Sequence, residues 1–254
     1  MHPKKERAML KVSGLSKHFN GVQAIVDVSF AVERGTITSI IGPNGAGKTT
    51  LFNLICGYTK PDAGDVMLEG CKLNSGPHLR ASKGIGRTFQ NLRIIGRISV
   101  LDNVMLAFGN HVNTGFIKSL SHSLSNKEEA KNRERAFEHL EFVGLASKSL
   151  DPAGSLSYGQ QKLLSLACCL ALDPKLLMLD EPVAGVNQET IARILDLLKK
   201  LRERGITTFF IEHNIDAVTQ ISDRLIVMDE GKIIDDNVPA IVKLNPAVID
   251  AYLS

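Results

Sequence analysis

The sequence predicts an α/β fold with a mixed or parallel core sheet, and three observations support this prediction. A short apolar, β-branched run at residues 36–41 leads directly into a glycine-rich loop and then into a helical pattern. A second apolar run, residues 176–179, is followed by two carboxylates. A mainly helical stretch, residues 100–172, separates these two regions. Short apolar runs that alternate with helical patterns are typical of an α/β core, so we expect the helical stretch to be an insert in that core.

Composition limits the class of protein. The chain has 254 residues, of which 44% are hydrophobic and 22% are charged, which is the balance of an ordinary globular protein. The length suits one large domain or a domain with a subdomain. The formal net charge of +3 gives no indication of nucleic-acid binding. The N-terminal residues lack the apolar segment of a signal peptide, and every apolar run is shorter than the ~20 residues that span a membrane. We therefore expect any membrane role to depend on a partner.

The four cysteines do not indicate a metal site or a disulfide framework. They lack CxxC spacing, and two of them are adjacent within an apolar run. We expect reduced thiols that behave as small hydrophobic side chains. They are Cys56, Cys71, Cys168 and Cys169.

The first third of the chain is expected to contain one helix and an antiparallel β subdomain beside the buried strand at residues 36–41. The helix is predicted at residues 50–56, because Gly57 follows as a helix stop. A hairpin is predicted around Glu69-Gly70. The other runs that are typical of strands lie at residues 10–15, 28–32, 65–68 and 72–73.

The middle of the chain is predicted to be a helical subdomain inserted at about residues 91–172. One helix is expected to start near Ser125 or Asn126, since each has capping-box spacing to a glutamate. That helix is expected to end at Gly144. Another helix is predicted to begin near Ser157 and to stop before the Asp-Pro pair that follows it.

The last third returns to alternating strands and helices. A helix with one apolar face is predicted to end at Gly205, between the strand at residues 176–179 and a buried strand at residues 206–211. Residues 225–228 and 232–234 flank a turn, and Asn245-Pro246 opens a final short helix. We expect residues 8–254 to form a single domain with a short helical tail at residues 239–254.

The glycine-rich loop fits the phosphate-loop motif GxxxxGK[ST] in full. Its glycines let backbone N–H groups converge on phosphate oxygens at a helix N-terminus. Lys48 is expected to act as a point charge on the phosphates, and the Thr49 hydroxyl as a Mg²⁺ ligand. A chance match is the alternative, and the correct order of strand, loop and helix argues against it. The motif consists of Gly42, Pro43, Asn44, Gly45, Ala46, Gly47, Lys48 and Thr49.

Asp180 and Glu181 are the second half of the expected site. They follow four apolar residues, and ligands of open α/β sheets bind at the carboxyl ends of strands. Asp180 suits the role of holding Mg²⁺. Glu181 points elsewhere because it is one residue further on, and it is expected to act on an attacking water as a general base.

Taken together, these motifs resemble those of the ABC ATPases. Leu156-Ser157-Tyr158-Gly159-Gln160 resembles the family's LSGGQ signature and precedes the Asp180-Glu181 strand, as it does there. The resemblance implies a P-loop NTPase fold of the ABC-ATPase type. The other elements also come in the family's order: Phe19 resembles the A-loop aromatic, Gln90 the Q-loop glutamine, Val183 to Asn187 the D-loop and His213 the switch histidine.

The resemblance also implies roles for these residues, with ATP and Mg²⁺ as the cofactors. Glu181 and His213 would be catalytic, and Thr49, Gln90 and Asp180 would hold the metal. The signature would contact the nucleotide of a second subunit, so that two chains must pair. The nucleotide would be bound by Phe19, by Gly42 to Thr50 (the phosphate loop with Thr50), and by Gln90, Ser157, Gly159 and Gln160.

Two departures from the common pattern, Tyr158 and Asn187, narrow the resemblance to the ATPases of branched-chain amino-acid importers. The stretches Gly86 to Asn91 and Pro246 to Leu253 are similar to that group as well. The implied partners are membrane permeases, a second ATPase subunit and, indirectly, an external solute-binding protein. The second subunit is either identical or different, with a different one favoured. No nucleic-acid partner is expected. The resemblance places the chain at the cytoplasmic face of the inner (plasma) membrane.

Three alternatives remain open from the sequence. Importers of urea, of amides or of another amino acid have closely similar ATPases. A soluble ABC ATPase of translation or repair is a second class, which usually has paired cassettes or long inserts. A nucleotide-binding regulator without hydrolysis is a third class, and the carboxylates at the strand end argue against it.

Overall fold

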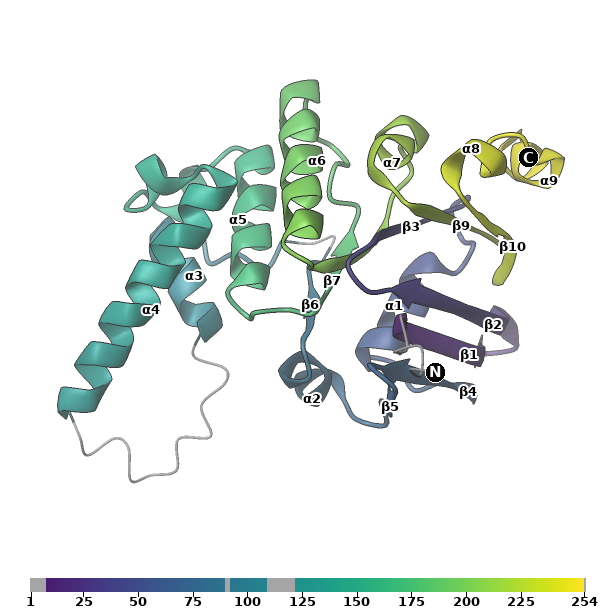
Figure 1. The fold of residues 1–254 in the computed structure, drawn as a ribbon, viewed down its shortest axis with the longest axis horizontal. Coiled ribbons are helices and arrows are strands. Elements are labelled where there is room, and N and C mark those ends of the chain that lie inside the picture. Colours follow the sequence, from purple (N-terminus) through teal and green to yellow (C-terminus); the bar gives the residue numbers. More distant parts are fainter. Residues whose placement is uncertain (1–7, 90–91, 109–121, 254) are drawn as a thin grey trace, which may run out of the picture. The chain divides into compact units, whose positions relative to one another are not determined.

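A computed structural model gives the structure of the chain and describes residues 8–89, 92–108 and 122–253 (Figure 1). The chain divides into two compact units. Unit 1 comprises residues 1–87, 175–184 and 188–254. Unit 2 comprises residues 88–174 and 185–187. Within the described residues, no helix is both long enough and apolar enough to cross a membrane.

Unit 1 contains a six-stranded mixed sheet in the order β10-β9-β3-β8-β7-β6. Only the β9–β10 pair is antiparallel, and the other neighbours run parallel. Every residue of β3, β7 and β8 is buried, which explains why apolar and β-branched residues dominate these strands in the sequence. The predicted α/β fold is confirmed. The strands are β3 (Ile37–Ile41), β6 (Ile85–Arg87), β7 (Leu176–Asp180), β8 (Thr207–Ile211), β9 (Arg224–Asp229) and β10 (Lys232–Asn237).

An antiparallel sheet in the order β2-β1-β4-β5 completes the β structure of unit 1. The strands are longer than predicted, because Asn20 (φ 45°) and Gly21 (φ 87°) form a two-residue turn that pairs β1 with β2 along most of their lengths. The hairpin around Glu69-Gly70 lies where it was predicted. The strands are β1 (Ala8–Phe19), β2 (Val22–Glu33), β4 (Ala63–Leu68) and β5 (Cys71–Lys72).

The hydrophobic core of unit 1 surrounds α1 (Lys48–Cys56). Phe52 of α1 packs on Phe209 of β8 with ring centroids 5.0 Å apart, and Phe209 lies 5.5 Å from Phe30 of β2. Buried residues of both sheets belong to the same hydrophobic cluster as the apolar residues of α1, so the helix is packed on both sheets. The helix begins two residues earlier than predicted, since Gly47 is its N-cap.

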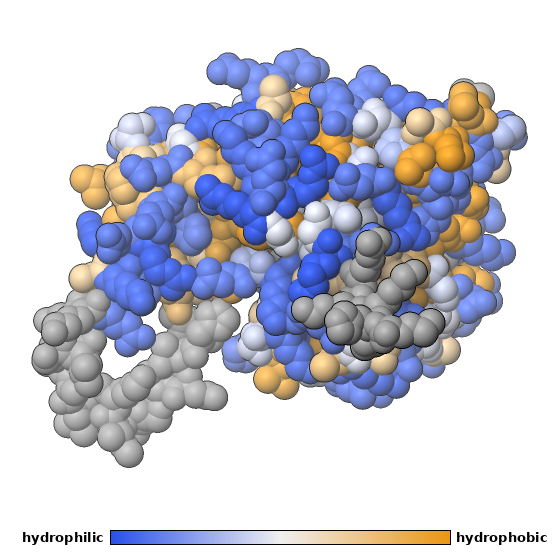
Figure 2. Space-filling model, viewed as in Figure 1, coloured by the Kyte–Doolittle hydropathy of each residue, from blue (hydrophilic) through white to orange (hydrophobic). Residues whose placement is uncertain are grey.

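The remaining helices of unit 1 follow its strands. The apolar face of α6 is buried, and Gly205 (φ 80°) follows its end as predicted. The short helices α2 and α7 were not predicted. Figure 2 shows hydrophobic side chains gathered over α8 and α9, where Val238, Ile241, Leu244 and Ile249 are exposed. The helices are α2 (Pro77–Ser82), α6 (Gln188–Glu203), α7 (Ile215–Ile221), α8 (Pro239–Val242) and α9 (Pro246–Leu253).

Arg80 of α2 holds the C-terminal end of α1. Its side chain is buried and donates four hydrogen bonds of 2.7 Å each to backbone carbonyls. Burial lowers the pKa of Arg80. Two of the bonds go to the last turn of α1, whose carbonyls have no partner within the helix. The four carbonyls belong to Leu54, Ile55, Leu73 and Ser75.

We expect Arg80→Met to lower the free energy of unfolding by about 3 kcal/mol, because several buried carbonyls lose their donor together. Urea unfolding of the purified chain measures the effect. Arg80→Lys should recover only part of the loss, since one ammonium cannot match the planar fork of the guanidinium. A Met variant as stable as the wild type would contradict this assignment.

Unit 2 is helical, as predicted, and α3, α4 and α5 pack against one another. One prediction is wrong: α4 begins at His122, so Ser125 and Asn126 lie inside the helix rather than at its N-cap. Capping-box spacing also fits the interior of a helix, where residues three apart share one face. The end of α4 before Gly144 and the start of α5 after Ser157 are confirmed. The elements are α3 (Val100–Phe108), α4 (His122–Val143), α5 (Tyr158–Leu170) and the 3₁₀ turns Ala146–Lys148 and Ala153–Ser155.

Candidate functional site

The phosphate loop connects the buried strand β3 to α1. Gly42 and Gly47 have positive φ angles of 151° and 96°. A Cβ built on Gly42 would lie 2.0 Å from the carbonyl oxygen of Met228, and one on Gly47 would lie 2.4 Å from that of Ala24. The backbone therefore approaches its neighbours too closely for any side chain at these two positions. Asn44, Gly45 and Thr49 are exposed on the loop and the first turn of α1.

Lys48 lies over the loop and places a positive charge there. Its Nζ donates hydrogen bonds of 2.8 Å to the carbonyl oxygens of Gly42 and Pro43. Burial lowers the pKa of Lys48, and the nearby carboxylates of Glu181 and Asp180 raise it. The ammonium therefore lies within electrostatic reach of both acidic residues at the end of β7, Asp180 and Glu181. This arrangement suits the binding of an anion between the loop and a bound cation.

Asp180, at the end of β7, is paired with Arg87, a residue that the sequence reasoning missed. Arg87 Nη2 lies 3.3 Å from Asp180 Oδ2, and both side chains are almost fully buried. Arg87 Nη1 also donates to Asn53 Oδ1 at 2.8 Å. Its guanidinium lies over the rings of Phe52 and Tyr58. Burial raises the pKa of Asp180, and Arg87 lowers it.

Glu181 and His213 meet at the carboxyl ends of β7 and β8. His213 Nε2 lies 3.1 Å from Glu181 Oε1. Glu181 has a left-handed backbone (φ 51°), which is unusual for a residue other than glycine. Its N–H donates to the carbonyl oxygen of Ile211 at 3.0 Å, which anchors it to β8. Backbone strain of this kind concentrates at functional sites.

Glu212 fixes the two segments that carry this pair, and the sequence reasoning missed it as well. Its side chain is 1% exposed. One carboxylate oxygen accepts from the N–H of Val183 at 2.7 Å, and the other accepts from the N–H of His213 at 3.1 Å. A carboxylate directly after a buried strand was the available signal, because a buried carboxylate needs hydrogen-bond partners.

Phe19 ends β1, on a hairpin that lies beside the phosphate loop. The hairpin approaches the loop at Ala24 of β2, whose carbonyl oxygen is the atom that a Cβ on Gly47 would strike. Two residues further on, the N–H of Val26 donates to the carbonyl oxygen of Gly231 at 2.9 Å. The ring of Phe19 is 45% exposed, and the ammonium of Lys17 lies 5.3 Å from its centroid. The hairpin that approaches the loop at Ala24 thus carries a partly exposed aromatic ring at its tip.

The signature residues belong to unit 2. Ser157 is the N-cap of α5 and forms a capping box with Gln160. Gln160 N–H donates to Ser157 Oγ at 3.3 Å, and Ser157 N–H donates to Gln160 Oε1 at 3.0 Å. Gly159 is partly exposed in the first turn. Unit 1 therefore brings together the loop, Asp180, Glu181, His213 and the Phe19 hairpin, whereas the signature lies in the other unit. Gln90 lies outside the described residues.

The donors present fit a cation that is held mainly by phosphates and water. Among the described residues, no group of three or more His, Cys, Asp or Glu could hold a metal ion. Mg²⁺ is commonly bound through one or two carboxylates together with substrate phosphates. Asp180 offers one carboxylate at the strand end, and Thr49 offers an exposed hydroxyl in the first turn of α1.

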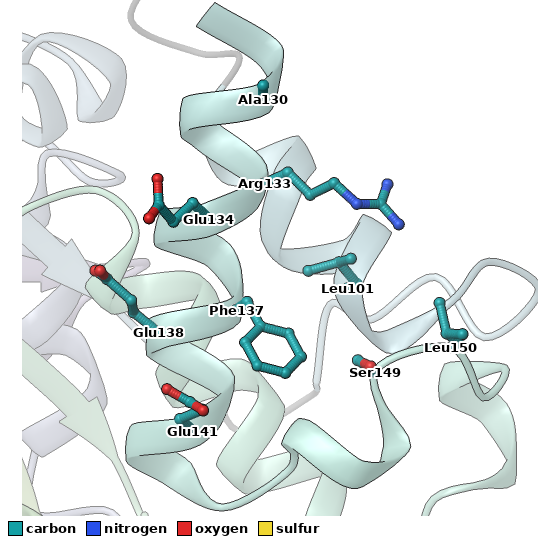
Figure 3. Close-up of a pocket in the computed structure, with 9 residues that line it drawn as sticks. All are labelled: Leu101, Ala130, Arg133, Glu134, Phe137, Glu138, Glu141, Ser149 and Leu150. Atoms are coloured by element: carbon teal, nitrogen blue, oxygen red, sulfur yellow. The ribbon is translucent and has the colours of Figure 1, made fainter.

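A groove of about 700 Å³ lies in unit 2 (Figure 3). It contains none of the residues predicted for the nucleotide site. Phe137 of α4 points into it, opposite Leu101 and Leu150. Three carboxylates of α4, those of Glu134, Glu138 and Glu141, also line it.

Comparison with known proteins agrees with this geometry. Residues 25–184 match the family described as "ABC transporter". The chain is 40% identical over 250 residues to the high-affinity branched-chain amino acid transport ATP-binding protein BraF of Pseudomonas aeruginosa. That alignment covers 97% of this chain and 98% of the relative.

Two solved structures are also similar. A nucleotide-free ATP-binding cassette from an ABC transporter has a TM-score of 0.85 and 34% identity, with 97% of this chain and 99% of that chain covered. A dimeric ATP-binding cassette in a post-hydrolysis state, bound to ADP and Pi, has a TM-score of 0.77 and 27% identity. It covers 91% of this chain and 99% of its own.

Proposed function

We propose, from the premise that this chain belongs to the ABC transporter family, that it is the ATP-hydrolysing subunit of an importer for branched-chain amino acids. Nucleotide binding and ATP hydrolysis are the properties of the family's cassette. The observation that carries the proposal is the grouping of Lys48, Asp180, Glu181 and His213 around one phosphate loop. The proposed solute class rests on the likeness to BraF along nearly the whole chain.

In this proposal the phosphates of ATP accept from the backbone N–H groups of residues 44–50, at the positive end of the α1 dipole. The Lys48 ammonium gives up its hydrogen bonds to the carbonyl oxygens of Gly42 and Pro43 and donates to phosphate oxygens instead. Its positive charge therefore stays at the loop. Phe19 provides the aromatic face for adenine. The position of its hairpin beside Gly47 supports this role.

We propose that Asp180 and Thr49 hold Mg²⁺, Asp180 through water, and that Gln90 contributes as well. When bound, Mg²⁺ neutralises charge on the phosphates. The contribution of the chain is orientation, since Asp180 is held in the buried end of β7 by Arg87.

Glu181 orients and activates the attacking water, and His213 donates to the γ-phosphate. Their 3.1 Å contact supports a shared task, because a hydrogen-bonded partner fixes the direction of the carboxylate. Glu212 positions both residues. Its carboxylate accepts from the N–H of Val183, two residues after Glu181, and from the N–H of His213 itself.

Two subunits act together in this proposal. Ser157, Gly159 and Gln160 of one subunit complete the nucleotide site of the other, so closure on ATP and opening after hydrolysis move the attached permeases. The dimeric post-hydrolysis structure supports the pairing. The partner ATPase is an identical or a different chain. The proposed complex contains two permeases at the cytoplasmic face of the inner membrane, and an external solute-binding protein delivers the solute.

Transport in proteoliposomes tests the proposal. The chain is reconstituted with candidate permeases and a candidate solute-binding protein from its own organism, and uptake of labelled leucine is compared with that of urea and of a short amide. ATP-dependent leucine uptake that is lost in Lys48→Ala is the expected result. Uptake of urea or amide alone would reassign the solute. Failure of the chain to bind any permease would favour a soluble ATPase.

A further inference from the structure

Tyr158 is the first helical residue of α5, and its ring packs against the backbone of Gly185. A Cβ built on Gly185 would lie 3.2 Å from Tyr158 Cε1 and 3.9 Å from Cδ1. Gly185 has a φ of 73°, where residues with side chains are strained. The glycine therefore meets two requirements at once: it allows the left-handed turn and leaves room for the ring.

This contact lies entirely within unit 2, because residues 185–187 belong to that unit. The residues on either side of the segment, 175–184 and 188 onward, belong to unit 1. Three residues of the connection between β7 and α6 thus cluster with unit 2, and Gly185 among them contacts the signature helix. The atoms nearest to the side-chain position of Gly185 belong to the ring of Tyr158.

The ring has a defined position. Ser157 caps the helix that begins at Tyr158, which fixes the backbone from which the ring extends. The ammonium of Lys162, one turn further along α5, lies 5.4 Å from the ring centroid. A cation over an aromatic face is attracted to it, so the side chain has neighbours on the helix as well as at Gly185.

The segment is also connected to the catalytic carboxylate. The N–H of Ala184, the residue before Gly185, donates to the carbonyl oxygen of Glu181 at 3.3 Å. The N–H of Val183 donates to Glu212 Oε1 at 2.7 Å. A single hydrogen-bonded turn therefore links Glu181 to the residue before Gly185.

We infer that Tyr158 is a positioning residue that couples the N-terminus of α5 to Glu181 through Gly185. This inference rests on the proposed function, in which Ser157 contacts the nucleotide of the partner while Glu181 serves the nucleotide of its own subunit. When the partner's nucleotide binds at the N-terminus of α5, the contact between Tyr158 and Gly185 fixes the position of the Glu181 carboxylate in this subunit. Tyr158 itself touches no reacting atom.

Kinetics provide the first test, in the reconstituted transporter. Tyr158→Ala removes the ring and keeps a good helix former, and Tyr158→Phe removes only the hydroxyl. We expect kcat to fall by about 10- to 100-fold in Tyr158→Ala, with the KM for ATP unchanged within about twofold. Tyr158→Phe should behave as the wild type. Equal losses in the Ala and Phe variants would overturn the role of the ring.

The pair Tyr158 and Gly185 provides a double-mutant cycle. Gly185→Ala places a methyl group against the ring, so its effect on kcat should depend on whether the ring is present. We expect the double variant to lose less than the product of the two single losses. Independent effects that multiply would show that the contact carries no coupling.

Hydrogen exchange separates this inference from the proposed function, because it needs no turnover. In a Glu181→Gln background, ATP should slow amide exchange at residues 157–160 and also at 184–187. With Tyr158→Ala added, only residues 157–160 should respond. A response in both segments without the ring would overturn the coupling alone. The absence of any ATP response in every variant would overturn the proposed function, and the coupling with it.

Discussion

Replacing Glu181 with glutamine should abolish ATP turnover while ATP binding persists, and it should trap paired subunits with nucleotide bound. Glutamine has the shape of glutamate but cannot accept a proton from water, so the loss should be about 10²- to 10⁴-fold. The unusual backbone of Glu181 is held by the hydrogen bond to Ile211, which the substitution leaves in place. Steady-state hydrolysis, equilibrium binding of ATP and size-exclusion chromatography measure the three outcomes.

Glu203→Gln serves as the matched control, since Glu203 is an exposed glutamate at the end of α6 in the same unit. It should hydrolyse ATP at the wild-type rate. Undiminished hydrolysis in Glu181→Gln would remove Glu181 from the role of base. Loss of ATP binding in that variant would indicate damage to the phosphate loop instead.

Arg87→Met should be the most destabilising single change in the core of the site. It leaves the carboxylate of Asp180 buried without its guanidinium, and breaking such a pair typically costs about 3–5 kcal/mol. Burial already raises the pKa of Asp180, and Arg87 opposes that effect. In the variant, the folded-state pKa therefore rises further above the ordinary value of about 3.9.

The pH dependence of this loss has a definite sign. Between the unfolded and folded pKa values of Asp180, the folded chain binds more protons than the unfolded chain. The free energy of unfolding of the variant therefore falls as pH rises through that window. We expect the deficit against wild type to be small near pH 4 and full near pH 8, measured by thermal unfolding at each pH.

Two further variants identify the cause. Arg87→Met with Asp180→Asn should recover most of the stability, since the buried carboxylate that lost its partner is no longer charged. Arg34→Met removes an arginine whose side chain is 50% exposed and which pairs with Glu69 at 2.8 Å. It should change stability by less than about 1 kcal/mol. A deficit in Arg87→Met that does not vary with pH would contradict the assignment to Asp180.

The fold could be predicted largely because its central strands are buried on both faces. Such strands are dominated by apolar and β-branched residues, as in β3, β7 and β8. The antiparallel part was harder, since its strands are only partly buried and their pattern is irregular. Even so, Asn20-Gly21 is a hairpin signal that the sequence reasoning did not use.

The residues of the candidate site also differ in how well the sequence predicts them. The phosphate loop is local in sequence, so its glycines, Lys48 and Thr49 could be identified from spacing alone. The pairing of Arg87 with Asp180 joins strands that are 93 residues apart and depends on β6 lying beside β7. The approach of Tyr158 to Gly185 likewise depends on how unit 2 is assembled, and no spacing in the sequence predicts it.

Arg80 has a consequence beyond the stability of α1. The guanidinium supplies positive charge to the pole of the helix where carbonyl oxygens accumulate, at Leu54 and Ile55. The opposite pole, at Gly47 and Lys48, is the one that faces the phosphate loop. A helix of nine residues is about 13 Å long, so the two ends of its dipole lie close to each other. With its negative end compensated inside the protein, the helix presents to an incoming anion a field dominated by its positive end.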